Sequence, residues 1–134
     1  MELFNLIKAA SRVYLIGNGG SYANAVHICN DLLACGVRAY TLDPASLTAS
    51  ANDYGYETVF ARWLETIGDA GDLLIALSGS GKSPNILLAV EMATKLGMKV
   101  WCEFGAAKGF DMQVSEEEQL WLGHEVMRCF THKN

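Results

Sequence analysis

The sequence predicts an α/β protein built on a parallel, helix-covered sheet. Short apolar runs alternate along the chain with segments of helical spacing, which is the order that βαβ units produce. Two of the runs, residues 13–16 and 73–77, are continuously apolar, as expected of strands buried on both faces. Each of these two runs leads into a Gly/Ser-rich turn that opens a helical stretch, so the turns are expected at the carboxyl ends of the strands.

The individual elements follow from this alternation in chain order. Apolar residues at helical spacing predict helices, and short apolar runs between turn signals predict strands. The expected helices cover residues 2–10, 22–33, 58–67, 84–96 and 116–130. The expected strands cover residues 12–16, 38–42, 72–77 and 99–104, with a possible weak fifth strand at 111–114. Residues 43–56 contain Asp, Pro, Asn and Gly and are expected to form a loop or a short helix.

Local signals mark several of these boundaries. Leu3, Leu6 and Ile7 share one face of the first helix, and Gly36 follows the second helix as a terminator. Ser83 precedes Pro84, so Ser83 is expected to cap the helix that begins at Pro84.

Size, charge and cysteine content exclude several classes of protein. The chain has 134 residues, 51% of them hydrophobic, and is expected to form one compact domain over 1–134. A net charge of −5 without a Lys/Arg cluster argues against a nucleic-acid or anionic-membrane surface. No apolar run is long enough for a membrane helix, and the four cysteines form no C-x-x-C pair. A cytoplasmic protein with reduced thiols is expected.

The two Gly/Ser turns predict a phosphate site. Residues 17–21 read Gly-Asn-Gly-Gly-Ser, and residues 78–83 read Ser-Gly-Ser-Gly-Lys-Ser. Glycines let backbone N–H groups approach an anion, hydroxyls donate to it, and a helix N-terminus favours negative charge. Two such turns in one small domain indicate a phosphorylated small molecule held between them. The alternative is that the serines only cap helices and form turns.

The second turn also resembles a nucleotide-binding P-loop. Gly81, Lys82 and Ser83 match the end of the pattern G-x-x-x-x-G-K-[ST], but the first position of that pattern is Ala76 rather than glycine. No convincing strand with a metal-binding acid follows. A P-loop NTPase is therefore the least favoured alternative.

Histidines and carboxylates at helical spacing suggest a reactive or metal-binding cluster. His27 and Asp31 stand at i, i+4 on one helix face, a spacing that suits metal binding or acid/base chemistry. A half-buried histidine bonded to a surface aspartate would have the same pattern. On the last helix, Glu116 and His124 are further candidates, although acidic residues at a helix start also interact favourably with its dipole.

Together these residues resemble the sugar isomerase (SIS) domain family, and within it the phosphoheptose isomerase branch. The similarity runs from about residue 13 to residue 124. It rests on Gly-Asn-Gly-Gly-Ser at 17–21 with His27 following, on Ala-Asn-Asp-Tyr-Gly-Tyr at 51–56 and Phe-Ala-Arg at 60–62, and on Gly-Asp-Leu-Leu-Ile at 71–75 leading into the serine-rich turn. Ser-Pro-Asn-Ile at 83–86 and Gly-Met-Lys-Val at 97–100 complete the match.

The resemblance implies a doubly wound, flavodoxin-like sheet of about five strands. It also implies aldose–ketose isomerisation of sedoheptulose 7-phosphate to D-glycero-D-manno-heptose 7-phosphate through an enediol. Asp31 and His124 are then the expected acid/base pair. The expected ligands of one Zn²⁺ per site are His27, Asp31, Glu116 and His124. The expected substrate-binding residues are Asn18, Gly19, Gly20, Ser21, Asn52, Asp53, Ser78, Gly79, Ser80, Ser83 and Glu116.

The chain departs from the family pattern in three ways. Asp31 stands where the family has glutamate, and Glu116 stands where it has glutamine, which would strengthen a site for a divalent cation. The usual long N-terminal helix is reduced to residues 2–10, and the segment between Phe104 and Glu116 is shortened.

Two functions follow from the resemblance. One is an isomerase that forms a homodimer or homotetramer and takes a heptose or heptulose phosphate. The other is a non-catalytic SIS module that binds a sugar phosphate or a protein partner for regulation. The retained His27 and His124 favour the first, and the altered carboxylate at Asp31 and the reduced N-terminal helix favour the second.

Overall fold

The computed structural model describes residues 1–106 and 111–131. Its helices and strands alternate along the chain as the sequence predicts. In order they are α1 (Glu2–Ala9), β1 (Val13–Ile16), α2 (Gly20–Ala34), β2 (Ala39–Tyr40), α3 (Pro44–Tyr54), the 3₁₀ turn η1 (Tyr56–Thr58), α4 (Val59–Ile67), β3 (Leu73–Ser78), α5 (Pro84–Lys95), β4 (Lys99–Phe104) and α6 (Asp111–Thr131).

The strands form a parallel sheet in the order β2-β1-β3-β4. The doubly wound parallel fold is therefore confirmed, with four strands in the described residues where about five were expected. The expected weak strand at 111–114 is wrong, because these residues are the first turn of α6. Asp111 and the acidic run that follows favour a helix N-terminus, and Val114 is 55% exposed, so no buried strand face is available there.

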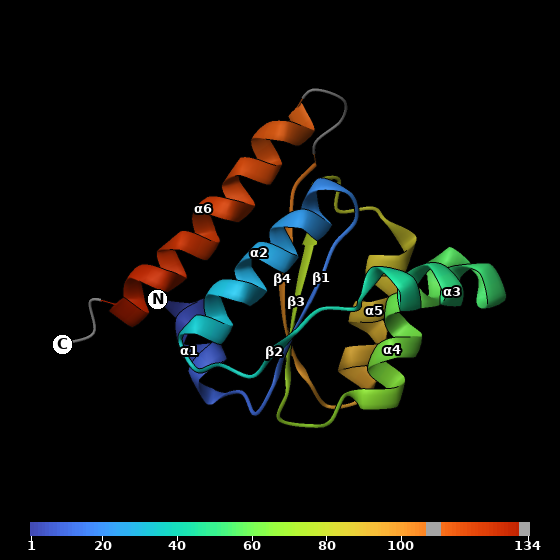
Figure 1. Cartoon of the computed structure of the whole chain (residues 1–134), viewed down its shortest axis with the longest axis horizontal. Helices are drawn as coiled ribbons and strands as arrows, with labels where there is room; N and C mark the ends of the chain where they lie inside the picture. The colour runs from blue at the N-terminus through green and yellow to red at the C-terminus, as the bar shows by residue number, and fades with distance from the viewer. Residues whose placement is uncertain (107–110, 132–134) are drawn as a thin grey trace.

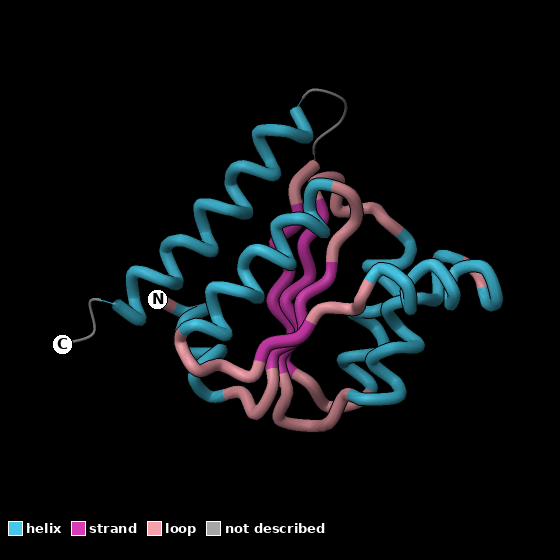
Figure 2. The backbone as a smooth tube through the Cα atoms, in the orientation of Figure 1, coloured by secondary structure: helices cyan, strands magenta, loops and turns pink. Residues whose placement is uncertain are grey.

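Two helical layers cover the sheet, with α1, α2 and α6 on one side and α3, α4 and α5 on the other (Figures 1 and 2). Alternate residues of each strand supply the two cores. In β1, Val13 and Leu15 pack with the first layer, and Tyr14 and Ile16 pack with the second. This period of two follows from the pleat of the strand. It explains why both faces of β1 need apolar residues.

The structure settles one open expectation and changes one boundary. The segment expected as a loop or short helix is the helix α3, which begins where the Asp43 carboxylate accepts a hydrogen bond from the Ser46 N–H at 2.9 Å and Pro44 occupies the first turn. Strand β2 has only two residues, where residues 38–42 were expected. In the described part of the chain, no helix is both long enough and apolar enough to cross a membrane.

Helices α2 and α6 run side by side in the same direction, which positions the candidate site (Figure 1). Gly123 of α6 is buried against Ile28 of α2, and a Cβ at position 123 would lie 2.6 Å from Ile28 Cγ1. The small residue therefore allows close approach of the two helices. As a result, the N-termini of α2 and α6 lie at the same end of the molecule.

Candidate active site

The two Gly/Ser turns meet at the carboxyl ends of the adjacent strands β1 and β3. Between them lies a cavity of about 270 Å³. Its walls come from both turns, from the end of β3 and from the start of α6, and consist of Asn18, Gly19, Gly20, Ser21, Leu77, Ser78, Gly79, Ser80, Ser83, Met112 and Glu116. Eight of the predicted binding residues from the two turns are thus brought together, and Glu116 joins them.

The first turn places the N-terminus of α2 at this cavity. Gly19 is the N-cap, with a positive φ of 54°, and no side chain caps the helix among the described residues. Gly17 lies close to Ser21, because a Cβ at position 17 would be 2.6 Å from the Ser21 carbonyl carbon. The turn therefore requires glycine, and it leaves backbone N–H groups at the helix start available to an anion.

The second turn is closed by its own hydroxyls. Ser78 Oγ accepts from the Gly81 N–H at 3.0 Å, and Ser80 Oγ accepts from the Lys82 N–H at 3.1 Å. Each hydroxyl keeps its proton for a further acceptor. Ser83 stands at the N-cap of α5, but among the described residues its side chain makes no capping hydrogen bond, contrary to expectation. Ser83 is instead one of the residues that line the cavity.

The geometry of this turn also argues against the P-loop alternative. A P-loop lysine reaches the phosphates that the loop surrounds. Lys82 is exposed and is not among the described residues that line the cavity. No other Lys or Arg among the described residues lines it either. Among residues 1–106 and 111–131, the groups placed to hold an anion here are dipoles and hydroxyls rather than a cation.

A pair of amides joins the two turns: one is the predicted binding residue Asn18, and the other is Asn85, which the sequence analysis did not single out. Asn18 and Asn85 exchange two hydrogen bonds of 2.9 Å, and Tyr56 also donates to Asn18 Oδ1. Asn85 is buried immediately after the Ser83–Pro84 helix start. The pair sets the separation of the two turns and thus the width of the cavity. The signal available in the sequence was Asn85 itself, a polar residue at the second position of the helix that begins at Pro84.

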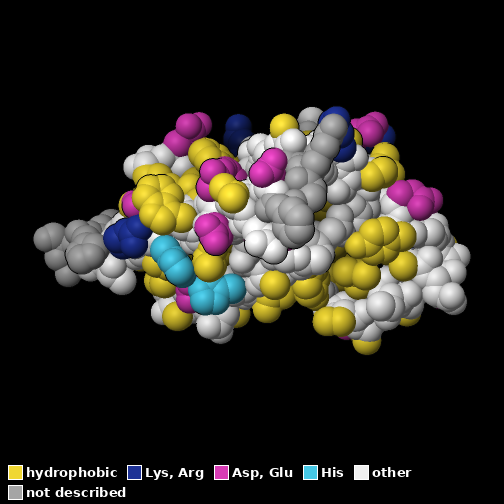
Figure 3. Space-filling view, turned by 90° about the horizontal axis from the view of Figure 1, so that it is seen from above, with side chains coloured by type: hydrophobic (Ala, Val, Ile, Leu, Met, Phe, Trp, Pro, Cys, Tyr) yellow, Lys and Arg dark blue, Asp and Glu magenta, His cyan; other side chains and the backbone are white. Residues whose placement is uncertain are grey.

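His27, Asp31 and His124 form a cluster on α2 and α6. His27 Nε2 lies 3.3 Å from His124 Nε2 and 3.3 Å from Asp31 Oδ2. The ligand atoms of all three side chains lie within 4.8 Å of one another. The His27 side chain is 50% exposed, and Figure 3 shows histidine side chains gathered at one place on the surface. The structure thus joins three of the four expected metal ligands.

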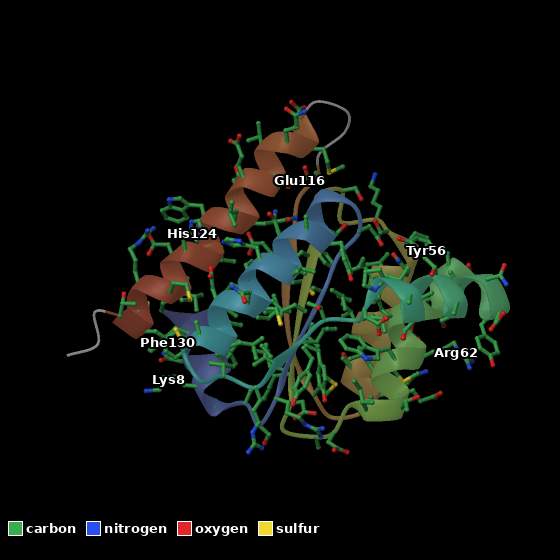
Figure 4. The ribbon with its side chains drawn as sticks, viewed as in Figure 1. Lys8, Tyr56, Arg62, Glu116, His124 and Phe130 are labelled. Carbon is green, nitrogen blue, oxygen red and sulfur yellow. The ribbon has the colours of Figure 1, made fainter. Side chains whose placement is uncertain are left out.

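The fourth expected ligand, Glu116, lies elsewhere. It stands eight residues before His124, about 12 Å along a helix axis, and nearer the top of α6 in Figure 4. Its carboxylate rests against Gly20, where a Cβ would overlap it. Within the described residues the structure therefore places Glu116 in the cavity between the two turns and not in the histidine cluster. The reason is that α6 lies parallel to α2, which matches Glu116 to the start of α2 and His124 to its middle.

Gln119 is a buried polar residue of α6 that sequence reasoning missed. It donates to Ser21 Oγ at 3.0 Å and accepts from Asn24 Nδ2 at 3.0 Å, and Asn24 also donates to the Glu116 carbonyl. Gln119 is 1% exposed. These bonds set the register of α6 on α2, because a slip would leave buried polar groups without partners. A glutamine directly after three glutamates offered no apparent sequence signal.

Asn52 and Asp53 do not reach the cavity. They are exposed on α3, where Asn52 Nδ2 donates to Asp53 Oδ1 at 3.4 Å. Neither residue lines the cavity in the described part of the chain. Helix α3 approaches the first turn through Pro44, Leu47 and Thr48, which line a separate pocket with Gly17, Asn18 and Gly19. Their role in binding stays a prediction.

Residues 2–102 match the family model of the SIS domain. The chain belongs to the SIS domain family. The parallel α/β sheet and its two Gly/Ser turns agree with this membership. The remaining residues, including α6 and His124, lie outside the matched range.

Several similar proteins are phosphoheptose isomerases by name. A phosphoheptose isomerase of Akkermansia muciniphila is 42% identical over 118 residues, which is 82% of this chain and 62% of that protein. The solved phosphoheptose isomerase of Francisella tularensis superposes with a TM-score of 0.86 at 26% identity, covering 98% of this chain and 83% of that one. The phosphoheptose isomerase GmhA of Neisseria gonorrhoeae gives a TM-score of 0.84 at 27% identity over 97% and 81%. The chain spans about three fifths of the length of the curated relatives.

Proposed function

We propose that the protein is a sugar-phosphate aldose–ketose isomerase, with sedoheptulose 7-phosphate as substrate. One observation carries the proposal: α2 bears an anion cradle at its start and an imidazole–carboxylate cluster further along. Gly20 and His27 are seven residues apart, on the same helix face and about 10 Å apart along the axis. An extended seven-carbon sugar phosphate has about that length. The names of the relatives support the same reaction.

In the described part of the chain, the groups that would bind the phosphate end are uncharged. Backbone N–H groups at the starts of α2 and α5 and the hydroxyls of Ser80 and Ser83 converge on the cavity. Binding energy gained at this remote group orients the reacting carbons, which raises the rate of a step that the phosphate does not enter.

The reacting end would use Asp31 and His124. Moving a carbonyl between C1 and C2 needs a base that takes a carbon-bound proton and an acid that protonates the enediol oxygen. A carboxylate and an imidazole suit these tasks near neutral pH. His27 lies between the two, 3.3 Å from each, so it holds both side chains in place.

The same cluster fits a Zn²⁺ ion. Two imidazoles and one carboxylate with ligand atoms within 4.8 Å match the donors that catalytic zinc takes, and such a set leaves a coordination position open. His27, Asp31 and His124 would hold the ion, which would polarise the sugar oxygens when bound. Zinc content can be measured by mass spectrometry of the purified protein, with His27→Ala expected to lose the metal.

The turnover assay tests the proposal directly. Purified protein is incubated with sedoheptulose 7-phosphate, with and without added zinc, and the aldose product is separated by chromatography. Conversion that disappears in the Asp31→Asn variant supports the proposal. Absence of conversion under both conditions contradicts it.

We also propose that the protein acts as a homodimer or homotetramer in the cytoplasm. The histidine cluster is open to solvent in one chain, so a second subunit would exclude water from the reacting carbons. The four cysteines are unpaired, in keeping with a reducing compartment.

One observation favours the alternative of a regulatory sugar-phosphate-binding module. The carboxylate of Glu116 faces the anion cavity instead of joining the histidine cluster. If sugar phosphate binds but no product forms even with zinc, the module takes the place of the isomerase.

A further inference from the structure

Strand β4 leaves one side of the sheet open. It is six residues long, contains no proline, and pairs with β3 along its whole length. Within residues 1–106 and 111–131, no strand pairs with its other side. The residues expected to supply a fifth strand are in α6. Such an edge is a template for another strand unless it is covered or charged.

The free hydrogen-bonding groups of this edge can be assigned. The Lys99 N–H donates to Asp72 O at 3.0 Å, and the Gly105 N–H donates to Ser78 O at 2.9 Å, so both point toward β3. Successive residues of a strand direct these groups to opposite sides. The N–H and C=O groups of Val100, Cys102 and Phe104 therefore face outward.

The edge is complementary to itself in the antiparallel direction. With two copies related by a twofold axis at Trp101, the outward groups of Val100 meet those of Cys102 of the second copy. The same register puts Lys99 opposite Glu103 of the second copy, and the twofold axis repeats this pair with the two copies exchanged. These three odd-numbered residues share one face of the sheet, as the 3.2 Å bond from Trp101 Nε1 to Glu103 Oε1 shows. Opposite charges at facing positions stabilise a strand pair.

Other registers lack this match. A shift by one residue would set the outward-directed groups of one copy opposite residues whose groups point toward β3, so the two edges could not bond. A shift by two would place Lys99 opposite Gly105 and Glu103 opposite Trp101. The charge pattern therefore selects the register centred on Trp101.

We propose that β4 pairs antiparallel with β4 of a second copy of this chain, and so joins two sheets into one. The twofold axis stands perpendicular to the sheet, so each helical layer stays on its own side. The phosphate cavity lies at the ends of β1 and β3 and stays open. The contact does not depend on the proposed enzymatic function.

Charge reversal tests the contact. Molar mass is measured by light scattering across a concentration series for wild type, Lys99→Glu, Glu103→Lys and the double variant. Each single variant sets like charges opposite each other, so its dimer dissociation constant should rise at least tenfold, and the double variant should restore it. Lys95→Glu and Glu118→Lys change the same charges at exposed helix positions and should leave the mass unchanged.

A cross-link tests the register. Facing Cα atoms in a pair without mutual hydrogen bonds are about 4.5 Å apart, which a disulfide can span. Trp101→Cys in a Cys102→Ser background should form an intermolecular disulfide, and Lys95→Cys in the same background should not. A monomeric wild type, single variants of unchanged mass, or a double variant as dissociated as the singles would each overturn the proposal.

Discussion

Replacing Glu116 with glutamine should tighten the binding of phosphate. The Glu116 carboxylate lies on the cavity wall against the start of α2, where an anion is favoured. It therefore competes with a bound phosphate for the same helix dipole and also repels it. Glutamine has nearly the same shape without the charge, so the variant removes both effects.

The magnitude follows from the size of the cavity. A volume of about 270 Å³ corresponds to a radius of a few ångströms, so a bound phosphorus atom would lie near the Glu116 oxygens. Two unit charges about 6 Å apart interact by about 1–3 kcal/mol at an effective dielectric constant of about 20–80. Glu116 is partly exposed, so the lower part of this range applies and salt weakens it. We expect about tenfold tighter phosphate binding.

Calorimetry with inorganic phosphate, at low and at physiological salt, measures this effect. The matched control is Glu117→Gln, which removes the same charge from an exposed neighbour outside the cavity. Zinc affinity should not change in Glu116→Gln, because the histidine cluster is two helical turns away. Equal or weaker phosphate binding in Glu116→Gln, or an equal gain in Glu117→Gln, would refute the reasoning. Absence of phosphate binding in both wild type and variant would instead contradict the phosphate site itself.

Three further predictions concern the two ends of the site and a helix cap. Ser80→Ala with Ser83→Ala should weaken phosphate binding at least tenfold by calorimetry, since a hydrogen bond to a charged group contributes about 1.5–3 kcal/mol; unchanged affinity would remove these hydroxyls from the site. Asp31→Asn should lower the isomerisation rate by on the order of 100-fold or more without changing the melting temperature, and full activity would exclude Asp31 as the acid or base. The backbone hydrogen bond from Ser46 lowers the pKa of Asp43, so the stability it contributes is complete above the ordinary value of 3.8 and is lost as pH falls through the lowered pKa. Thermal melts of Asp43→Ala should therefore show a deficit at neutral pH that disappears in acid, and a deficit independent of pH would contradict the role of the charge.

Much of the fold could be predicted from local pattern. The apolar runs of β1 and β3 required strands buried on both faces, and their parallel arrangement followed from the helical segments between them. The failure at residues 111–114 has a local cause as well. Four residues with two apolar side chains suit either an exposed strand or a helix turn, and the acidic residues that follow decide for the helix.

For the site, the sequence by itself determined the chemistry of each turn and the pairing of His27 with Asp31, because both depend on residues close in the chain. Only the tertiary structure decided what stands opposite them. Helical periodicity gives the direction of a side chain around the axis of its helix. It does not give the height, which is the position along that axis at which a second helix makes contact. The bonds of Gln119 and the small Gly123 set that height, which brings His124 to His27 and places Glu116 in the cavity between the two turns.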